Sequence, residues 1–190
     1  MVILRPTQKL RVVLPLAETS ANIDAARGDT ALGDWYVNRV VVDRRPLLLL
    51  VSSTSLLPIL LPARDVRRLP DRFADIVAGR LRRLGIDAST IAKETEAMSP
   101  VVIGRTTDRS VVGIMVDFAK AVPYYLEAGF WEDGSLEIVE DRLAKTPCYA
   151  GHRAERVVFP DQRAPDLLRA RWVTQGAPHS FEGSRSPWLH

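Results

Sequence analysis

Short apolar runs in the first two thirds of the chain predict a small β-sheet. Residues 35–42 are rich in the aromatic and β-branched side chains that strands favour, and a polar turn separates them from the apolar run at residues 47–51. Together with the apolar run at residues 56–61, they predict an antiparallel meander of about three strands. Residues 2–4 and 101–103 are also apolar and of strand length, so one or two further strands are expected.

Helical periodicity predicts four or five helices packed with this sheet. Apolar residues at three- and four-residue spacing predict a helix from Pro70 that stops at Gly85, and Asp87 can cap a second helix that runs to about Met98. Three more are expected: a brief helix after Thr7, a long one over residues 111–126 with Pro123 forcing a kink or an end, and a last one capped by Ser135. Because strands and helices cluster rather than alternate, the pattern indicates an α+β fold with a small antiparallel sheet.

The last forty residues differ in composition from the rest. They contain all three histidines and several prolines, glycines and serines, a composition that interrupts regular structure. We therefore expect a single α+β domain over residues 1–150 and a C-terminal extension over residues 151–190 that is partly irregular or disordered. A histidine-based catalytic site would have to be built from this extension.

Overall composition narrows the class of protein. A chain of 190 residues with 46% hydrophobic residues can bury one ordinary core, and a net charge of +3 is too small to indicate nucleic-acid binding by itself. The single cysteine, Cys148, excludes an intramolecular disulfide and a cysteine metal cluster, and it fits a cytoplasmic location. Residues 46–63 carry no charge, but three prolines and a Ser/Thr-rich centre favour two buried strands over a membrane span. We expect no metal, no cofactor and no membrane partner.

The familiar catalytic and nucleotide-binding motifs are absent from the sequence. It contains no GxxxxGKS, GxGxxG or HExxH motif. Acidic pairs on predicted helices, such as Glu94 with Glu96 and Glu137 with Glu140, are interpreted as solvated side chains. The same interpretation applies to a second basic zone, in which aspartates interleave with Arg64, Arg67, Arg68, Arg80, Arg82 and Arg83.

One segment indicates an anion-binding site. Residues 104–110 join a predicted strand to a predicted helix, where unpaired backbone N–H groups and the positive end of the helix dipole point to the same place. The side chains that would add charge or hydroxyl donors for a phosphate or an RNA backbone are Arg105, Thr106, Arg109 and Ser110. The alternative is that Thr107 or Asp108 only caps the helix while the arginines are solvated.

Four further residues are candidates for an enzymatic site. Arg5 and Lys9 could surround a phosphate together with the arginines of residues 104–110, with Asp34 or Asp117 as acid or base. The alternative places Asp34 in a turn at the start of a strand and Asp117 on the outer side of a helix. Convergence of these groups in one concave pocket would favour an enzyme, and scattering would favour a binding module.

An ordered series of motifs resembles a known family. The motifs are ILRPTQKL (3–10), LGDWY (32–36), LLP (56–58), LPDRF (69–73), VIGRTxxRSVxGxMxDF (102–118) and LA with TPC (143–148). Over residues 2–148 they resemble an uncharacterised bacterial domain of unknown function, a family that implies a fold but no established activity, substrate or partner. Asp108 stands where that pattern has an amide, and the resemblance fades after Cys148.

The expected function follows from these observations. We predict a non-catalytic cytoplasmic binding or regulatory domain, whose partner is a phosphate-bearing ligand, a nucleic acid or a protein. The alternative is a small hydrolase or toxin-like ribonuclease acting on a phosphodiester.

Overall fold

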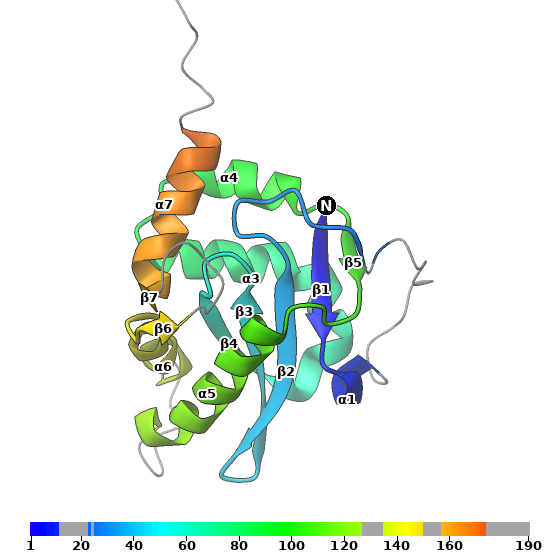
Figure 1. Ribbon diagram of the computed structural model, residues 1–190, viewed down its shortest axis with the longest axis vertical. Coiled ribbons are helices and arrows are strands. Elements are labelled where there is room, and N and C mark those ends of the chain that lie inside the picture. Colours follow the sequence, from blue (N-terminus) through cyan, green and yellow to red (C-terminus); the bar gives the residue numbers. More distant parts are fainter. Residues whose placement is uncertain (12–22, 24, 127–134, 150–156, 174–190) are drawn as a thin grey trace, which may run out of the picture.

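A five-stranded mixed sheet forms the centre of the molecule (Figure 1). The computed structural model describes residues 1–11, 23, 25–126, 135–149 and 157–173. The strand order is β4-β3-β2-β1-β5. The bounds are Val2–Pro6 for β1, Trp35–Val42 for β2, Arg45–Ser52 for β3, Pro58–Pro62 for β4 and Val101–Ile103 for β5. All five strands lie where the apolar runs predict them.

The direction of β1 corrects the expectation of an antiparallel sheet. β2, β3 and β4 form the predicted antiparallel meander, but β1 runs parallel to β2, with Leu4 opposite Trp35, and parallel to β5, with Ile3 opposite Val102. A long connection separates β1 from β2, which allows the chain to return to the same end of the sheet, as parallel pairing requires. Every residue of β1 is buried, as is typical of a strand covered on both faces.

The uncharged segment at residues 46–63 supplies most of β3 and all of β4, as predicted. The turn from β2 to β3 contains Asp43 and Arg44 with φ angles of 48° and 64°, the positive values that a tight two-residue hairpin requires. Within the described part of the chain, the structure has no helix with the length and apolarity needed to cross a membrane.

The described residues include six α-helices, against the four or five expected. They are α1 (Gln8–Arg11), α3 (Leu69–Arg83), α4 (Ala88–Ala97), α5 (Arg109–Tyr125), α6 (Ser135–Ala144) and α7 (Pro160–Trp172). A 3-10 helix, η1 (Ala63–Arg68), leads from β4 into α3. Two of the predicted helix boundaries are confirmed: Gly85 follows α3 with φ 75°, and the Asp87 carboxylate accepts a hydrogen bond from Thr90 N at the start of α4.

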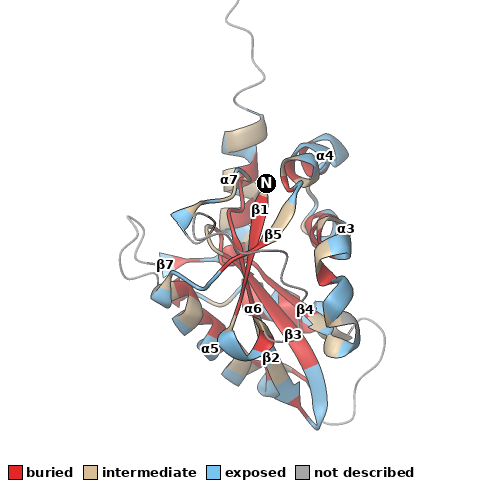
Figure 2. Cartoon of the chain, turned by 90° about the vertical axis from the view of Figure 1, so that its right-hand side faces the viewer, coloured by how far each residue is buried: buried red, intermediate tan, exposed pale blue. Residues whose placement is uncertain are grey.

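Helices cover both faces of the sheet (Figure 2). Phe73, Val77 and Leu81 of α3 pack with Ile91 of α4 on one face, where the ring of Phe73 meets Trp35 edge-on at 5.6 Å. On the other face, α5 and α6 contribute a second core. The sheet is therefore the middle of three layers, and its two apolar faces form two separate cores.

Helix α7 belongs to the first of these cores. Its residues Ala164 and Leu168 are 0% and 1% exposed. The carboxylate of Glu94, itself fully buried in α4, accepts hydrogen bonds from Trp172 Nε1 at 2.7 Å and from the backbone N–H groups of Ala31 and Leu32. The interpretation of Glu94 as solvated was wrong, because these three donors replace water around its charge.

A two-stranded sheet of β6 (Cys148–Tyr149) and β7 (Val157–Val158) precedes α7. These elements lie on both sides of the boundary expected near residue 150. The division of the chain at that point stays a prediction, and the part of the extension beyond Val173 lies outside the described residues.

Candidate functional site

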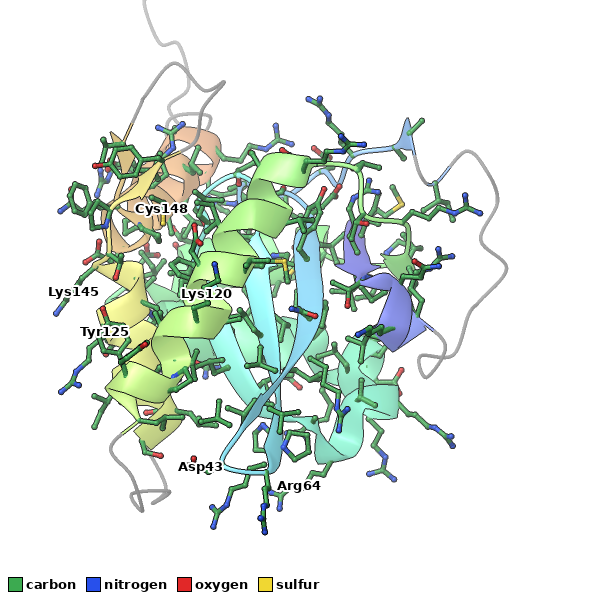
Figure 3. The ribbon with its side chains drawn as sticks, turned by 60° about the horizontal axis from the view of Figure 1, so that its bottom comes forward. Asp43, Arg64, Lys120, Tyr125, Lys145 and Cys148 are labelled. Carbon is green, nitrogen blue, oxygen red and sulfur yellow. The ribbon has the colours of Figure 1, made fainter. Side chains whose placement is uncertain are left out.

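A cavity of about 1210 Å³ lies at the end of the sheet that carries the β2–β3 turn. Its walls come from α1, the three meander strands, η1, α3 and α6. Figure 3 looks onto this end of the molecule, with Asp43 of the turn and Arg64 of η1 labelled. Val37 and Val41 of β2 are four residues apart and therefore lie on the same face of the sheet, the one that meets α3. Val37 is fully buried, whereas Val41 is 56% exposed. The helical layer covers only the first part of the strand.

The walls of the cavity carry an excess of positive charge. Six basic side chains line it, against three acidic ones. The basic residues are Lys9, Arg39, Arg45, Arg64, Arg72 and Arg83, and the acidic residues are Asp75, Glu137 and Glu140. None of the carboxylates that the structure describes forms an ion pair with Lys9, Arg39 or Arg72. Half of the cationic side chains therefore face the cavity without a compensating acid from the described chain.

An ion network closes one wall of the cavity between α3 and α6. The carboxylate of Glu140 accepts a hydrogen bond from Leu60 N of β4 at 2.7 Å and one from Arg83. Arg80, which is 1% exposed, places Nε 3.6 Å from Glu140 and pairs with Asp141. These contacts fasten α6 to the edge of the sheet. The interpretation of Glu140 and Arg80 as solvated side chains was wrong, because both are buried and both belong to this network of ion pairs and hydrogen bonds.

Glu140 is the titratable group of the cavity with the most perturbed environment. Burial raises the pKa of its carboxyl group to about 7, against the opposing effects of the Leu60 N–H group, Arg83 and Arg80. Both oxygens are engaged by partners from the chain, one by Leu60 N and one by Arg83. In this arrangement the side chain holds the wall of the cavity in place.

The structure brings together three of the residues that sequence reasoning singles out. Arg5 and Asp34 are 2% and 6% exposed, and Arg5 Nε lies 2.7 Å from Asp34 Oδ2. Arg5 also donates to the carbonyl oxygens of Arg105 and Ala26, each at 2.7 Å. The buried pair therefore ties β1, the start of β2 and the loop after β5 into one unit, and its polar groups are directed at the protein itself.

Arg105 and Thr106, in the loop between β5 and α5, and Arg109, the first residue of α5, are exposed. The Asp108 carboxylate accepts hydrogen bonds from the backbone N–H groups of Ser110 and Val111, at 2.8 and 3.4 Å. Asp108 therefore caps α5, as the alternative interpretation of this segment proposed. A carboxylate already occupies the position that an external anion would take. The anion-binding hypothesis for Arg105, Thr106, Arg109 and Ser110 stays a prediction.

The remaining candidates lie apart from this loop. Lys9, in α1 directly after β1, lines the cavity. Asp117 lies on the outer side of α5, with a side chain that is 72% exposed and 3.9 Å from Lys120. The eight candidate residues thus occupy three places. These are the buried Arg5–Asp34 pair with the adjoining residues 104–110, the cavity, and the surface of α5.

Sequence reasoning missed the basic lining of the cavity. Arg39, Arg45 and Arg72 were not singled out, and Arg64 and Arg83 were assigned to a solvated face. One signal was available: Arg39 lies between Val37 and Val41 at positions that share one face of a strand, where an arginine interrupts an apolar series. The other members come from separate elements, so their convergence is visible only in the folded chain.

The fold and the cavity define a class of protein: an α+β domain in which a mixed sheet lies between two helical layers and ends in a basic cavity. The chain belongs to the family described as Domain of unknown function (DUF6933), whose family model matches residues 3–163. The expected membership in a family of unknown function is thereby confirmed. The match continues past Cys148 to residue 163, so the expectation that the resemblance fades after Cys148 was wrong. No curated protein and no solved structure matches the chain.

Proposed function

We propose that this protein is a non-catalytic binding or regulatory domain that takes a phosphate-bearing ligand into the basic cavity. The observation that carries the proposal is the set of Lys9, Arg39 and Arg72, three cationic side chains that line one cavity and have no acidic partner among the described residues. A concave site lined by one sign of charge concentrates ions of the opposite sign. Guanidinium groups also match the geometry of phosphate oxygens, so Arg39 and Arg72 are suited to bind a phosphate group.

Titration calorimetry with inorganic pyrophosphate tests the proposal. We expect binding that weakens as salt rises, and a loss of about fivefold or more in Arg39→Gln and in Arg72→Gln, because each removes one charge within reach of the anion. Arg67→Gln is the matched control, since Arg67 is exposed on the neighbouring element η1 and does not line the cavity. Equal effects of all three substitutions, or no binding to the parent protein, would contradict the proposal.

A second candidate, a hydrolase acting on a phosphodiester, is favoured by Glu140. Burial raises the pKa of the Glu140 carboxyl group to about 7 at the wall of the same cavity, a value suited to a general acid or base near neutral pH. The test is hydrolysis of bis(4-nitrophenyl) phosphate and of RNA by the parent protein and by Glu140→Gln. Activity that disappears in Glu140→Gln while pyrophosphate binding persists would establish the enzyme in place of the binding domain.

The bacterial origin and the cytoplasmic location also remain proposals. The single, buried Cys148 supports a compartment in which thiols stay reduced. Fractionation of the native host, with detection of the protein by antibody, would test the location.

A further inference from the structure

The floor of the basic cavity is aliphatic. Between the charged side chains, the lining includes Leu10, Val41, Leu61, Val66 and Ile76. Val41 is 56% exposed, and Leu61, Val66 and Ile76 are only partly buried, so each leaves apolar surface open to a ligand. None of the described residues that line the cavity is aromatic. A nucleobase would therefore find no ring to stack on, whereas an alkyl chain could cover the exposed aliphatic surface.

The aliphatic and basic groups surround the same space. A smaller hollow of about 160 Å³ adjoins the cavity and shares Leu61, Ile76, Arg64 and Arg72 with it. Arg72 and Ile76 lie one helical turn apart on α3, at the spacing that places two side chains on the same face. A ligand whose anionic group contacts Arg72 is thus held directly beside Ile76 and Leu61.

The volume of the cavity also exceeds what a small anion needs. At about 1210 Å³ it is larger than the roughly 300–1,000 Å³ that is typical of sites for small organic molecules. A free phosphate ion would leave most of this space, and all of the aliphatic floor, in contact with water. The ligand that fits has a body as well as a charged group.

We infer that the cavity binds a free anionic amphiphile, a molecule with a phosphate head group and an aliphatic body. The inference rests on the proposed function, because it specifies the ligand class of the same cavity. The head group contacts Arg39 and Arg72, and the body covers Ile76, Leu61 and Val41. The phosphate head group is complementary in charge to the basic part of the wall. The aliphatic body covers the apolar part, so each end of the ligand has its own site.

Titration calorimetry with a series of n-alkyl phosphates, from ethyl to octyl and below their aggregation concentrations, tests the inference. Burial of each further methylene group is expected to tighten binding about fourfold until the floor is covered. Val41→Ser should reduce this dependence on chain length more than it weakens pyrophosphate binding, since Val41 contributes apolar surface and no charge to the cavity. Ile138→Ser, at a similarly exposed position on α6 that does not line the cavity, is the control and should change neither.

Each outcome decides between the inference and the proposed function. Equal affinity for ethyl and octyl phosphate, with pyrophosphate still bound, would overturn the inference and leave the phosphate-binding domain intact. Tighter binding of AMP, which carries the same phosphate group, than of octyl phosphate would also overturn it, in favour of a nucleotide. Binding to vesicles of an anionic phospholipid in place of free octyl phosphate would assign the basic residues to a membrane surface. Loss of binding to every probe would overturn both.

Discussion

Replacement of Glu94 by alanine should lower the stability of the fold by an amount that the structure allows us to work out. The substitution leaves the buried N–H groups of Ala31 and Leu32, which now lie 2.9 and 3.0 Å from the carboxylate, without an acceptor. Each unpaired buried donor costs about 1–3 kcal/mol, so the two together should lower the free energy of unfolding by about 4 kcal/mol. The third donor, Trp172 Nε1, is only partly buried and can turn to water.

Urea denaturation followed by circular dichroism measures this effect. With a slope of about 2 kcal/mol per molar urea, a loss of about 4 kcal/mol lowers the midpoint by about 2 M. Glu96→Ala is the matched control, because Glu96 lies two residues away on the same helix with an exposed side chain and should shift the midpoint little. Glu94→Gln keeps one carbonyl acceptor and should fall between the two. A Glu94→Ala midpoint equal to that of Glu96→Ala would refute the assignment of Glu94 as the common acceptor.

Three further outcomes are expected. Burial raises the pKa of Glu140 from 4.5 to about 7, so between these values the folded chain binds more protons than the unfolded chain. The free energy of unfolding should therefore fall as the pH rises through this window. Measured by urea denaturation, Glu140→Gln should gain on the order of 3 kcal/mol relative to the parent protein between pH 4.5 and pH 8. Leu168→Ala should cost about 2–5 kcal/mol in the same assay because Leu168 is buried in the core, whereas Leu167→Ala, at a partly exposed position, should cost less. Asp108→Ala should cost about 1 kcal/mol through loss of the helix cap without changing pyrophosphate affinity; tighter pyrophosphate binding in this variant would instead place the anion site at residues 104–110, because the substitution removes a negative charge there.

The parts of the fold that could be predicted are those fixed by local sequence. Aromatic and β-branched residues determine β2. The end of α3 follows from the backbone of Gly85, and the start of α4 follows from the side chain of Asp87. The direction of β1 could not be obtained in this way. An apolar run such as residues 2–4 has the same pattern in a parallel and in an antiparallel pair, and only the path of the chain between β1 and β2 decides.

The buried charges escaped prediction for a different reason. Glu94 and Glu140 are followed or preceded by other acidic residues on their helices, a pattern that is typical of a solvated face. Their partners are distant in sequence: Glu94 binds the N–H groups of Ala31 and Leu32, and Glu140 binds that of Leu60. Long-range partners of this kind carry no local signal. The basic cavity is hidden from the sequence in the same way, because its lining spans α1 to α6.

The edge of the sheet formed by β4 has a consequence for how copies of this protein behave toward one another. Leu60 N points away from β3 toward Glu140. Backbone N–H groups alternate in direction along a strand, so the other two residues of β4 on this outer side are Pro58 and Pro62, and proline has no N–H group. The edge therefore presents no unoccupied backbone donor to a strand from a second molecule, and edge-to-edge pairing, the first step of sheet aggregation, is blocked there. A side chain on α6 and two prolines thus remove the free N–H donors through which a second copy of the chain could pair with this edge.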